Sequence, residues 1–537
     1  MQPSEAAANQ NTEAAPVPSD FLPWAHRLTL LLLTAAGTAI RLLYLARKPF
    51  WFDECFSAEV ARIDWSSFAH LMWWREANMS LYYLLLRIWL GFESPHAQSE
   101  FFIRSLSVIF SAATLPAIYW LAGLLYDRRV ALIATALLFF NAYHVRYAQE
   151  ARSYSLFVLL ATLSSGFLIA FLRQPSRRLR TAYIVVSILA VYAHFYALLL
   201  VVAHWIVLRW LPPPQSANQS DVTFRAQMRH VWITIGIAVM PLLIFVAKTG
   251  AGPIKWIPRP GVRDLLVFYE HLAGGNSWPL PVIFAAACVA AIPYRKSLGQ
   301  SASEFDKAHP QTWKHWRVQF LLIWLLSPVI VTVLLSFIRP VFLPRYLIFC
   351  LPPLLILAAG GLARLRRWWL LAPALAIVLL LGSQAIFFVY AHDFDTERDA
   401  SGTATNFILD QAHPRDAILF HIADTRVAYE FFRSLRAGEN TASPAFTAPL
   451  GPEIVFPHHG AGLDYRDFTG KPAADLLHTA ATNHPRLWVM LMNNGPADNP
   501  DPTTVMLTRA LVDSFPTVQQ WQLPHVEVRL YGPLIEK

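Results

Sequence analysis

The sequence has little of what soluble nucleotide-dependent enzymes and metal-binding domains require. Only 15% of its 537 residues are charged, and it contains no Gly-rich phosphate loop and no internal repeat. Its three cysteines, Cys55, Cys288 and Cys350, lack the spacing of a zinc or redox site. A nucleotide site, a zinc knuckle and a disulfide framework are therefore not indicated.

Apolar and aromatic residues are abundant instead. Hydrophobic residues make up 55% of the chain, which contains 19 Trp and 35 Phe and has a mean hydropathy of +0.38. This composition is typical of a polytopic α-helical membrane protein. After a polar leader at residues 1–22 that has no signal-peptide pattern, about eleven transmembrane helices are predicted. They lie at about 27–46, 101–125, 130–145, 153–172, 181–193, 195–210, 231–248, 278–294, 318–338, 346–363 and 370–391.

Charge is distributed unevenly along the chain. Residues 1–391 carry 33 Lys+Arg against 17 Asp+Glu, whereas residues 392–537 carry 11 against 18. The basic residues gather in alternate turns between spans, which predicts a cytoplasmic N-terminus and an outer-face C-terminus. The basic excess therefore indicates membrane-flanking loops and not nucleic-acid binding. This interpretation predicts a multi-pass membrane protein.

The tail differs in pattern from the rest of the chain. Short apolar runs at 417–420, 487–491 and 526–530 predict strands, and residues 426–435 predict a helix between them. We therefore expect three parts: a leader at 1–22, a membrane domain at 23–391, and a small extracytoplasmic α/β domain at 392–537.

The first outer loop contains the pair of carboxylates best suited to acid–base chemistry. Asp53 and Glu54 lie between aromatic residues just beyond the first span, and residues 56–100 predict helices lying in the membrane interface. Within that first span, Arg41 is expected to reach the lipid head groups. Further charged or polar segments expected on the same face are Tyr143–Tyr154, Tyr192–Tyr196 and Arg339–Tyr346.

Carboxylates and arginines at one membrane face suit transfer of a sugar from a lipid phosphate. A carboxylate can accept the proton of an acceptor hydroxyl, and guanidinium groups can stabilise the departing phosphate. Each residue also has a purely structural interpretation: acids near a helix N-terminus, a satisfied histidine, or arginines that anchor helix ends.

The order of these motifs resembles the GT-C glycosyltransferases of family 39, the bacterial relatives of protein O-mannosyltransferases and lipid A aminoarabinose transferases. The matching segments cover about residues 27–365 and, more faintly, the tail. They are Trp51–Glu54, Leu81–Trp89, Phe102–Ser107, Gln149–Tyr154 and Arg345–Leu347 followed by Pro352.

The resemblance implies inverting transfer from a polyprenyl-phosphate donor to a lipid, glycan or protein acceptor, and it implies a location in a bacterial inner (cell) membrane. Asp53 would be the general base with Glu54 assisting, while Glu150 would orient the acceptor or a divalent metal. Arg345 and Arg152 would hold the donor phosphate. Three more residues, Tyr82, Arg104 and His194, are assigned to substrate binding.

The chain departs from the family where His-Pro-Pro usually precedes the Leu-Tyr-Tyr run. It has Asn78-Met79-Ser80 there, and Ala193 where a Thr commonly precedes the histidine of the fifth-span hairpin. A transporter or flippase for lipid-linked sugars and a catalytically inactive scaffold remain as alternative functions.

Overall fold

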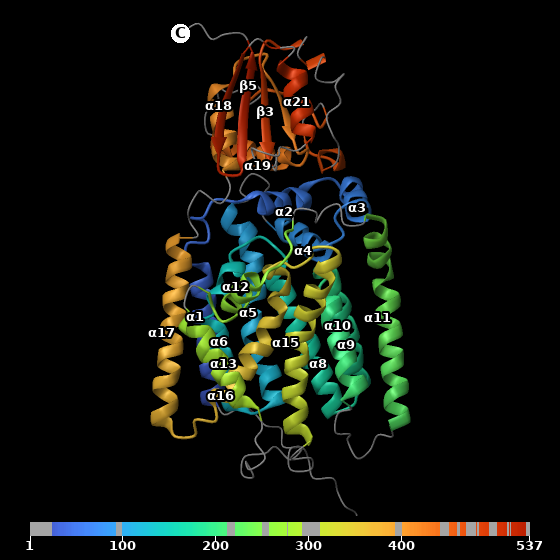
Figure 1. The fold of residues 1–537 in the computed structure, drawn as a ribbon, viewed down its shortest axis with the longest axis vertical. Helices are drawn as coiled ribbons and strands as arrows, with labels where there is room; N and C mark the ends of the chain where they lie inside the picture. Colours follow the sequence, from blue (N-terminus) through green and yellow to red (C-terminus); the bar gives the residue numbers. More distant parts are fainter. Residues whose placement is uncertain are drawn as a thin grey trace, which may run out of the picture.

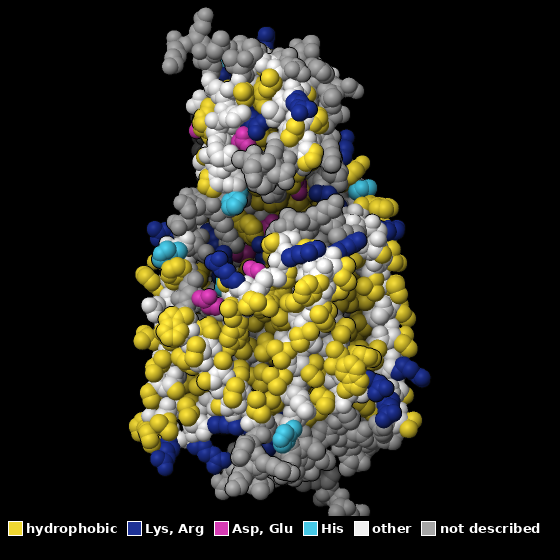
Figure 2. Space-filling view, viewed as in Figure 1, with side chains coloured by type: hydrophobic (Ala, Val, Ile, Leu, Met, Phe, Trp, Pro, Cys, Tyr) yellow, Lys and Arg dark blue, Asp and Glu magenta, His cyan; other side chains and the backbone are white. Residues whose placement is uncertain are grey.

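The computed structural model shows a helical bundle that carries a smaller sheet domain on one end (Figure 1). It describes residues 24–92, 99–211, 221–249, 257–275, 278–292, 312–392, 400–440, 451–458, 462–468, 479–480, 483–492, 502–512, 515 and 517–532. The leader at 1–22 lies outside the described residues. Figure 2 shows hydrophobic side chains across the visible face of the bundle, as expected of a surface that faces lipid.

The bundle is built from helices of very different length. The first helices are α1 (Trp24–Leu42), α2 (Phe52–Arg62), α3 (Trp65–Trp74) and α4 (Ser80–Leu90). The central group is α5 (Glu100–Leu125), α6 (Arg128–Phe139), α7 (Ala142–Ala148), α8 (Tyr154–Arg173), α9 (Arg177–Ala193) and α10 (Ala197–Trp210). The remaining ones are α11 (Asp221–Thr249), α12 (Val262–Leu272), α13 (Pro279–Ala291), α15 (Thr312–Ile338), the 3-10 helix η2 (Pro344–Cys350), α16 (Leu351–Leu362) and α17 (Trp368–His392).

Among the described residues, six helical segments are long and apolar enough to cross a membrane, namely α5, α8, α11, α15, η2 with α16, and α17. The span predicted at 130–145 is broken, because α6 and α7 meet at an angle of 61°. The described part of the chain thus confirms a polytopic membrane protein, while the count of eleven spans stays a prediction. Helices α2, α3 and α4 are short and lie between the bundle and the sheet domain (Figure 1).

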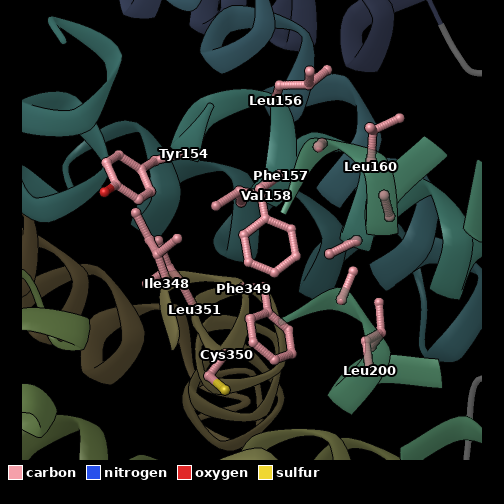
Figure 3. Packing of buried hydrophobic residues seen from close by; sticks show 14 of the residues in the cluster. Tyr154, Leu156, Phe157, Val158, Leu160, Leu200, Ile348, Phe349, Cys350 and Leu351 are labelled. Carbon is pink, nitrogen blue, oxygen red and sulfur yellow. The ribbon is translucent and has the colours of Figure 1, made fainter. Parts of the chain in front are cut away.

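Tight packing at the centre fixes the bundle. The ring of Phe157 on α8 lies 4.9 Å from that of Phe349 on η2, within the apolar cluster of Figure 3. A Cβ added to Gly361 on α16 would lie 1.8 Å from the carbonyl oxygen of Ala287 on α13, so only glycine permits this close approach. This rigid interior holds the helix ends that carry the polar residues.

Arg41 does not reach the head groups, so that prediction is wrong. Its side chain is fully buried. Its Nε donates to Ser111 Oγ at 2.7 Å, and its Nη2 lies 3.0 Å from His144 Nδ1. A buried guanidinium requires such partners, and these link α1 to α5 and α7.

The C-terminal domain has the expected α/β organisation. Its five-stranded sheet has the order β2-β1-β3-β5-β4, with parallel pairs on one side and antiparallel pairs on the other. The strands are β1 (Ala417–His421), β2 (Glu453–Phe456), β3 (Leu487–Met492), β4 (Thr517–Leu523) and β5 (Val526–Gly532). Between them lie α18 (Ser401–Gln411), α19 (Thr425–Asn440), the 3-10 helix η4 (Tyr465–Phe468) and α21 (Pro502–Val512).

The predicted strands at 417–420, 487–491 and 526–530 are confirmed as β1, β3 and β5, and the predicted helix is part of α19. Alternate side chains of β1 enter different cores. Leu419 packs in the cluster that includes Leu507 of α21, and Phe420 packs in the cluster that includes Ile408 of α18. Helices thus cover both faces of the sheet, which explains the continuous apolar strands.

The C-terminal domain rests directly on the first outer loop. The ring of Phe431 on α19 stacks on Phe50 with centroids 4.9 Å apart, and Phe468 on η4 meets Phe56 of α2 edge-on at 5.1 Å. This apolar contact places the start of α19 beside α2, the helix that carries Asp53.

Candidate active site

The two neighbouring carboxylates occupy the first turn of α2. Trp51 precedes the helix with an extended backbone, and Asp53 and Glu54 follow in the first turn, where acids interact favourably with the helix dipole. Successive side chains on a helix point about 100° apart. The Glu54 side chain is therefore fully buried, while that of Asp53 keeps 21% of its surface exposed.

Glu54 is engaged by Arg104 of α5. Arg104 donates from Nε to Glu54 Oε1 at 2.8 Å and from Nη2 to Oε2 at 2.6 Å, and the Ala151 backbone N–H also donates to Oε1 at 2.8 Å. Arg104 further donates to the carbonyl oxygens of Leu45 and Lys48, at 2.8 and 2.6 Å. The geometry favours a positioning role for both residues, while the catalytic role of Glu54 and the substrate-binding role of Arg104 stay predictions.

Asp53 lies between two guanidinium groups that come from distant segments. Its Oδ2 is 3.6 Å from Arg152 Nη2 and 3.9 Å from Arg345 Nη2. These separations are ion pairs rather than hydrogen bonds. Arg152 Nη1 also donates to the Asp53 carbonyl oxygen at 3.2 Å and to Ser57 Oγ at 3.3 Å, which fixes the guanidinium against α2.

The surroundings keep Arg152 charged. Burial alone would lower its pKa, but the nearby Asp53, Tyr83 and Tyr154 side chains together hold that pKa well above its ordinary value. An arginine that stays cationic in a buried site is suited to binding a phosphate.

Tyr82 is linked to Arg152 through Ser107. Its hydroxyl is 2.9 Å from Ser107 Oγ, and Ser107 donates to the Arg152 carbonyl oxygen at 3.3 Å. Tyr82 is fully buried, and these contacts indicate that it helps to position Arg152; its role in substrate binding stays a prediction.

His194 packs among aromatic side chains. Its ring stacks on Phe157 with centroids 4.9 Å apart and lies 4.9 Å from the ring of Tyr346. His194 Nδ1 accepts from the Tyr196 backbone N–H at 3.3 Å, which places the ring proton on Nε2. This Nε2 is buried and has no hydrogen-bond partner, so the ring presents a neutral donor.

The departure at Asn78 has a structural explanation. Asn78 Oδ1 accepts a hydrogen bond from the Phe195 backbone N–H at 3.1 Å, and Ser80 Oγ donates to the Tyr192 carbonyl oxygen at 3.4 Å. Met79 between them has a positive φ of 68°. Both polar residues therefore hold the turn before α4 against the turn that carries His194.

The orienting or metal-binding role of Glu150 stays a prediction. Glu150 is fully buried, and its Oε1 lies 4.0 Å from Arg146 Nε. Among the described residues, the one group of at least three metal-ligating side chains that could share an ion is His458, Asp464 and Asp467, and it excludes Glu150. Even there, Arg426 Nη1 lies 2.8 Å from Asp467 Oδ1 and already supplies a positive charge.

Four more residues influence Asp53 or Arg152 electrostatically, and sequence reasoning did not select them as site residues. The buried hydroxyls of Tyr83 and Tyr154 have no hydrogen-bond partner. Burial raises the pKa of Glu76 to about 7 and that of Asp424 to about 6, with Asp53 close enough to contribute to both shifts. The Leu-Tyr-Tyr run could have signalled Tyr83, but no local pattern connects Asp424 to a site more than 300 residues earlier.

Comparison with known proteins gives structural matches alone. No protein-family model matches the chain, and no curated protein matches it significantly. ArnT from Cupriavidus metallidurans in the apo state superimposes with a TM-score of 0.59 at 14% identity, over 95% of this chain and 100% of that one. The same protein bound to undecaprenyl phosphate gives a TM-score of 0.55 at 14% identity, over 94% and 99% of the two chains. The chain therefore has the membrane fold of ArnT over almost its whole length, which is the GT-C fold expected from its motifs.

Proposed function

We propose that this protein is a membrane glycosyltransferase that moves one sugar from a polyprenyl-phosphate carrier to an acceptor hydroxyl. The observation that carries the proposal is the position of the Asp53 carboxylate, 3.6 and 3.9 Å from the guanidinium groups of Arg152 and Arg345. A base next to two cations is the arrangement that such a transfer requires. The likeness to an ArnT structure bound to undecaprenyl phosphate supports a lipid-phosphate donor.

The proposed reaction is a single displacement that inverts the anomeric centre. Asp53 accepts the proton of the acceptor hydroxyl while the acceptor oxygen forms a bond to the anomeric carbon. The bond from that carbon to the phosphate oxygen breaks, and its electron pair stays on the phosphate. Arg152 and Arg345 stabilise the charge that grows there.

The polarity of the bundle supports transfer on the outer face. Helix α5 starts beside the Asp53 site, where Arg104 binds Glu54, and its 26 residues extend about 39 Å to the turn that carries Arg128 and Arg129. Helix α8 likewise starts next to Arg152 and ends at Arg173. Because arginine-rich turns favour the cytoplasm, the Asp53 site and the C-terminal domain belong on the opposite, outer side.

The Asp53→Asn variant tests this proposal. Loss of the general base should reduce transfer about 10²- to 10⁴-fold without preventing membrane insertion. Transfer is measured by mass spectrometry of envelope glycolipids and glycoproteins in cells with and without the protein. Asp410→Asn is the matched control, since the Asp410 side chain is 57% exposed and pairs with Arg436 of the same C-terminal domain. Wild-type turnover by the Asp53 variant would refute the assigned base.

A further inference from the structure

We propose that the end of the bundle opposite the sheet domain contains a second binding site, a basic pocket between α8, α9 and α11 that binds a phosphate group. Its place at the membrane surface favours the phosphate of an anionic lipid. This inference does not depend on the proposed transfer reaction, because the pocket and Asp53 lie at opposite ends of α8. That helix starts next to Arg152, and its 20 residues extend about 30 Å to Arg173.

The pocket lies where the ends of three helices meet. Its volume of about 340 Å³ falls within the range of about 300–1,000 Å³ that small-ligand sites occupy, so a lipid head group can fit. The described residues that line it come from the end of α8, the turn that follows, the start of α9, and α11. They are Phe171, Pro175, Ser176, Arg177, Arg180 and Gln227.

The two arginines of the pocket are placed to bind one anion together. Residues three positions apart on a helix lie on the same face, so Arg177 and Arg180 line the pocket from one side of α9. Within the described part of the chain, neither guanidinium forms a hydrogen bond or an ion pair. Their N–H donors can therefore engage the oxygens of a phosphate, for which the planar guanidinium fork is well suited.

Acidic residues are nearly absent from this part of the sequence. Residues 171–230 contain a single acid, Asp221, and seven arginines. The arginines are Arg173, Arg177, Arg178, Arg180, Arg209, Arg225 and Arg229. None of the described residues that line the pocket is acidic. The local charge therefore attracts an anion and repels a metal cation or a basic peptide.

The surface next to the pocket is one that lipid covers. Helix α11 packs on α9 at the edge of the bundle (Figure 1), and only 28% of its most apolar part is buried. Ile233 and Ile237, on the α11 segment that follows Gln227, are 53% and 67% exposed. Basic pockets between membrane helices on the cytoplasmic side are typical sites for anionic lipid head groups. A lipid whose phosphate binds the two arginines would lay its acyl chains along this apolar surface.

Binding of dioctanoyl phosphatidylglycerol to the purified full-length protein in detergent tests the inference, with native mass spectrometry as the measurement. The dissociation constant of the Arg177→Gln/Arg180→Gln variant should rise about 10- to 100-fold above wild type, because the charged hydrogen-bond donors are lost. The matched control is Arg178→Gln/Arg229→Gln, which removes the same charge from two exposed arginines outside the pocket. Its dissociation constant should stay within about twofold of wild type.

Two further ligands separate the phosphate group from the acyl chains and from free phosphate. Dioctanoyl phosphatidylcholine has the same chains and no net charge, so it should bind wild type at least about 10-fold more weakly. Equal affinities for the two lipids would overturn the inference, since the chains alone would then bind. Inorganic phosphate that binds as tightly as phosphatidylglycerol, through the same two arginines, would overturn the lipid assignment.

The comparison of variants is decisive in both directions. Phosphatidylglycerol affinity that is equal in wild type and the pocket variant, or that falls equally in the pocket variant and the control, would overturn the inference. The single variants Arg177→Gln and Arg180→Gln should each weaken binding about 3- to 10-fold, and they replace the double variant if it does not fold. Transfer at the Asp53 site is measured separately, so a failure here leaves the proposed function untouched.

Discussion

Replacing Glu54 by Gln separates a positioning carboxylate from a catalytic one. Three hydrogen bonds converge on the Glu54 oxygens, two from Arg104 and one from the Ala151 backbone, and both charged side chains are fully buried. Glutamine removes the negative charge and turns an amide N–H₂ toward a guanidinium that has only donors. Removing one partner of a buried ion pair typically costs 3–5 kcal/mol, because the other charge is left uncompensated.

We therefore expect Glu54→Gln to lower the free energy of unfolding by about 3–5 kcal/mol and to reduce transfer through displacement of Asp53. Unfolding is followed by Trp fluorescence in detergent against denaturant. A double-mutant cycle with Arg104→Gln should give a double variant less destabilised than the sum of the single changes. An unfolding free energy within about 1 kcal/mol of wild type, together with abolished transfer, would instead make Glu54 a catalytic group.

Two further predictions concern the turn before α4. Asn78→Ala should destabilise the protein by about 1–2 kcal/mol, because the Phe195 backbone N–H loses its acceptor. Asn78→Asp keeps an acceptor oxygen and should keep most of the stability. Thermal unfolding measures both variants, and equal losses of stability would contradict this prediction. Burial raises the pKa of Glu76 from 4.5 to about 7, so the folded protein binds this proton more tightly than the unfolded chain does. The resulting stability is complete below about pH 4.5 and is lost as the pH rises through about 7, so wild type should lose about 3 kcal/mol over that window relative to Glu76→Gln; parallel pH profiles of unfolding would refute the shift.

Local pattern in the sequence was enough for the class of protein and for much of its secondary structure. Long apolar runs predict membrane helices because the lipid interior requires every backbone group to be bonded within its own helix. Short apolar runs between polar segments predicted β1, β3 and β5 for the same local reason. The broken α6–α7 segment was missed, since apolar composition does not report a bend of 61°.

Only the tertiary structure decided which polar residues share a site and which hold it together. Asp53 and Glu54 are neighbours in sequence with the same chemistry. Helical geometry nevertheless leaves Asp53 partly exposed beside Arg152 and buries Glu54 against Arg104. The C-terminal domain packs on the first outer loop through Phe431 against Phe50 and Phe468 against Phe56, pairs that no local pattern predicts. A sequence records the chemical identity and local periodicity of its residues, whereas the partners that each charge meets depend on contacts between segments hundreds of residues apart.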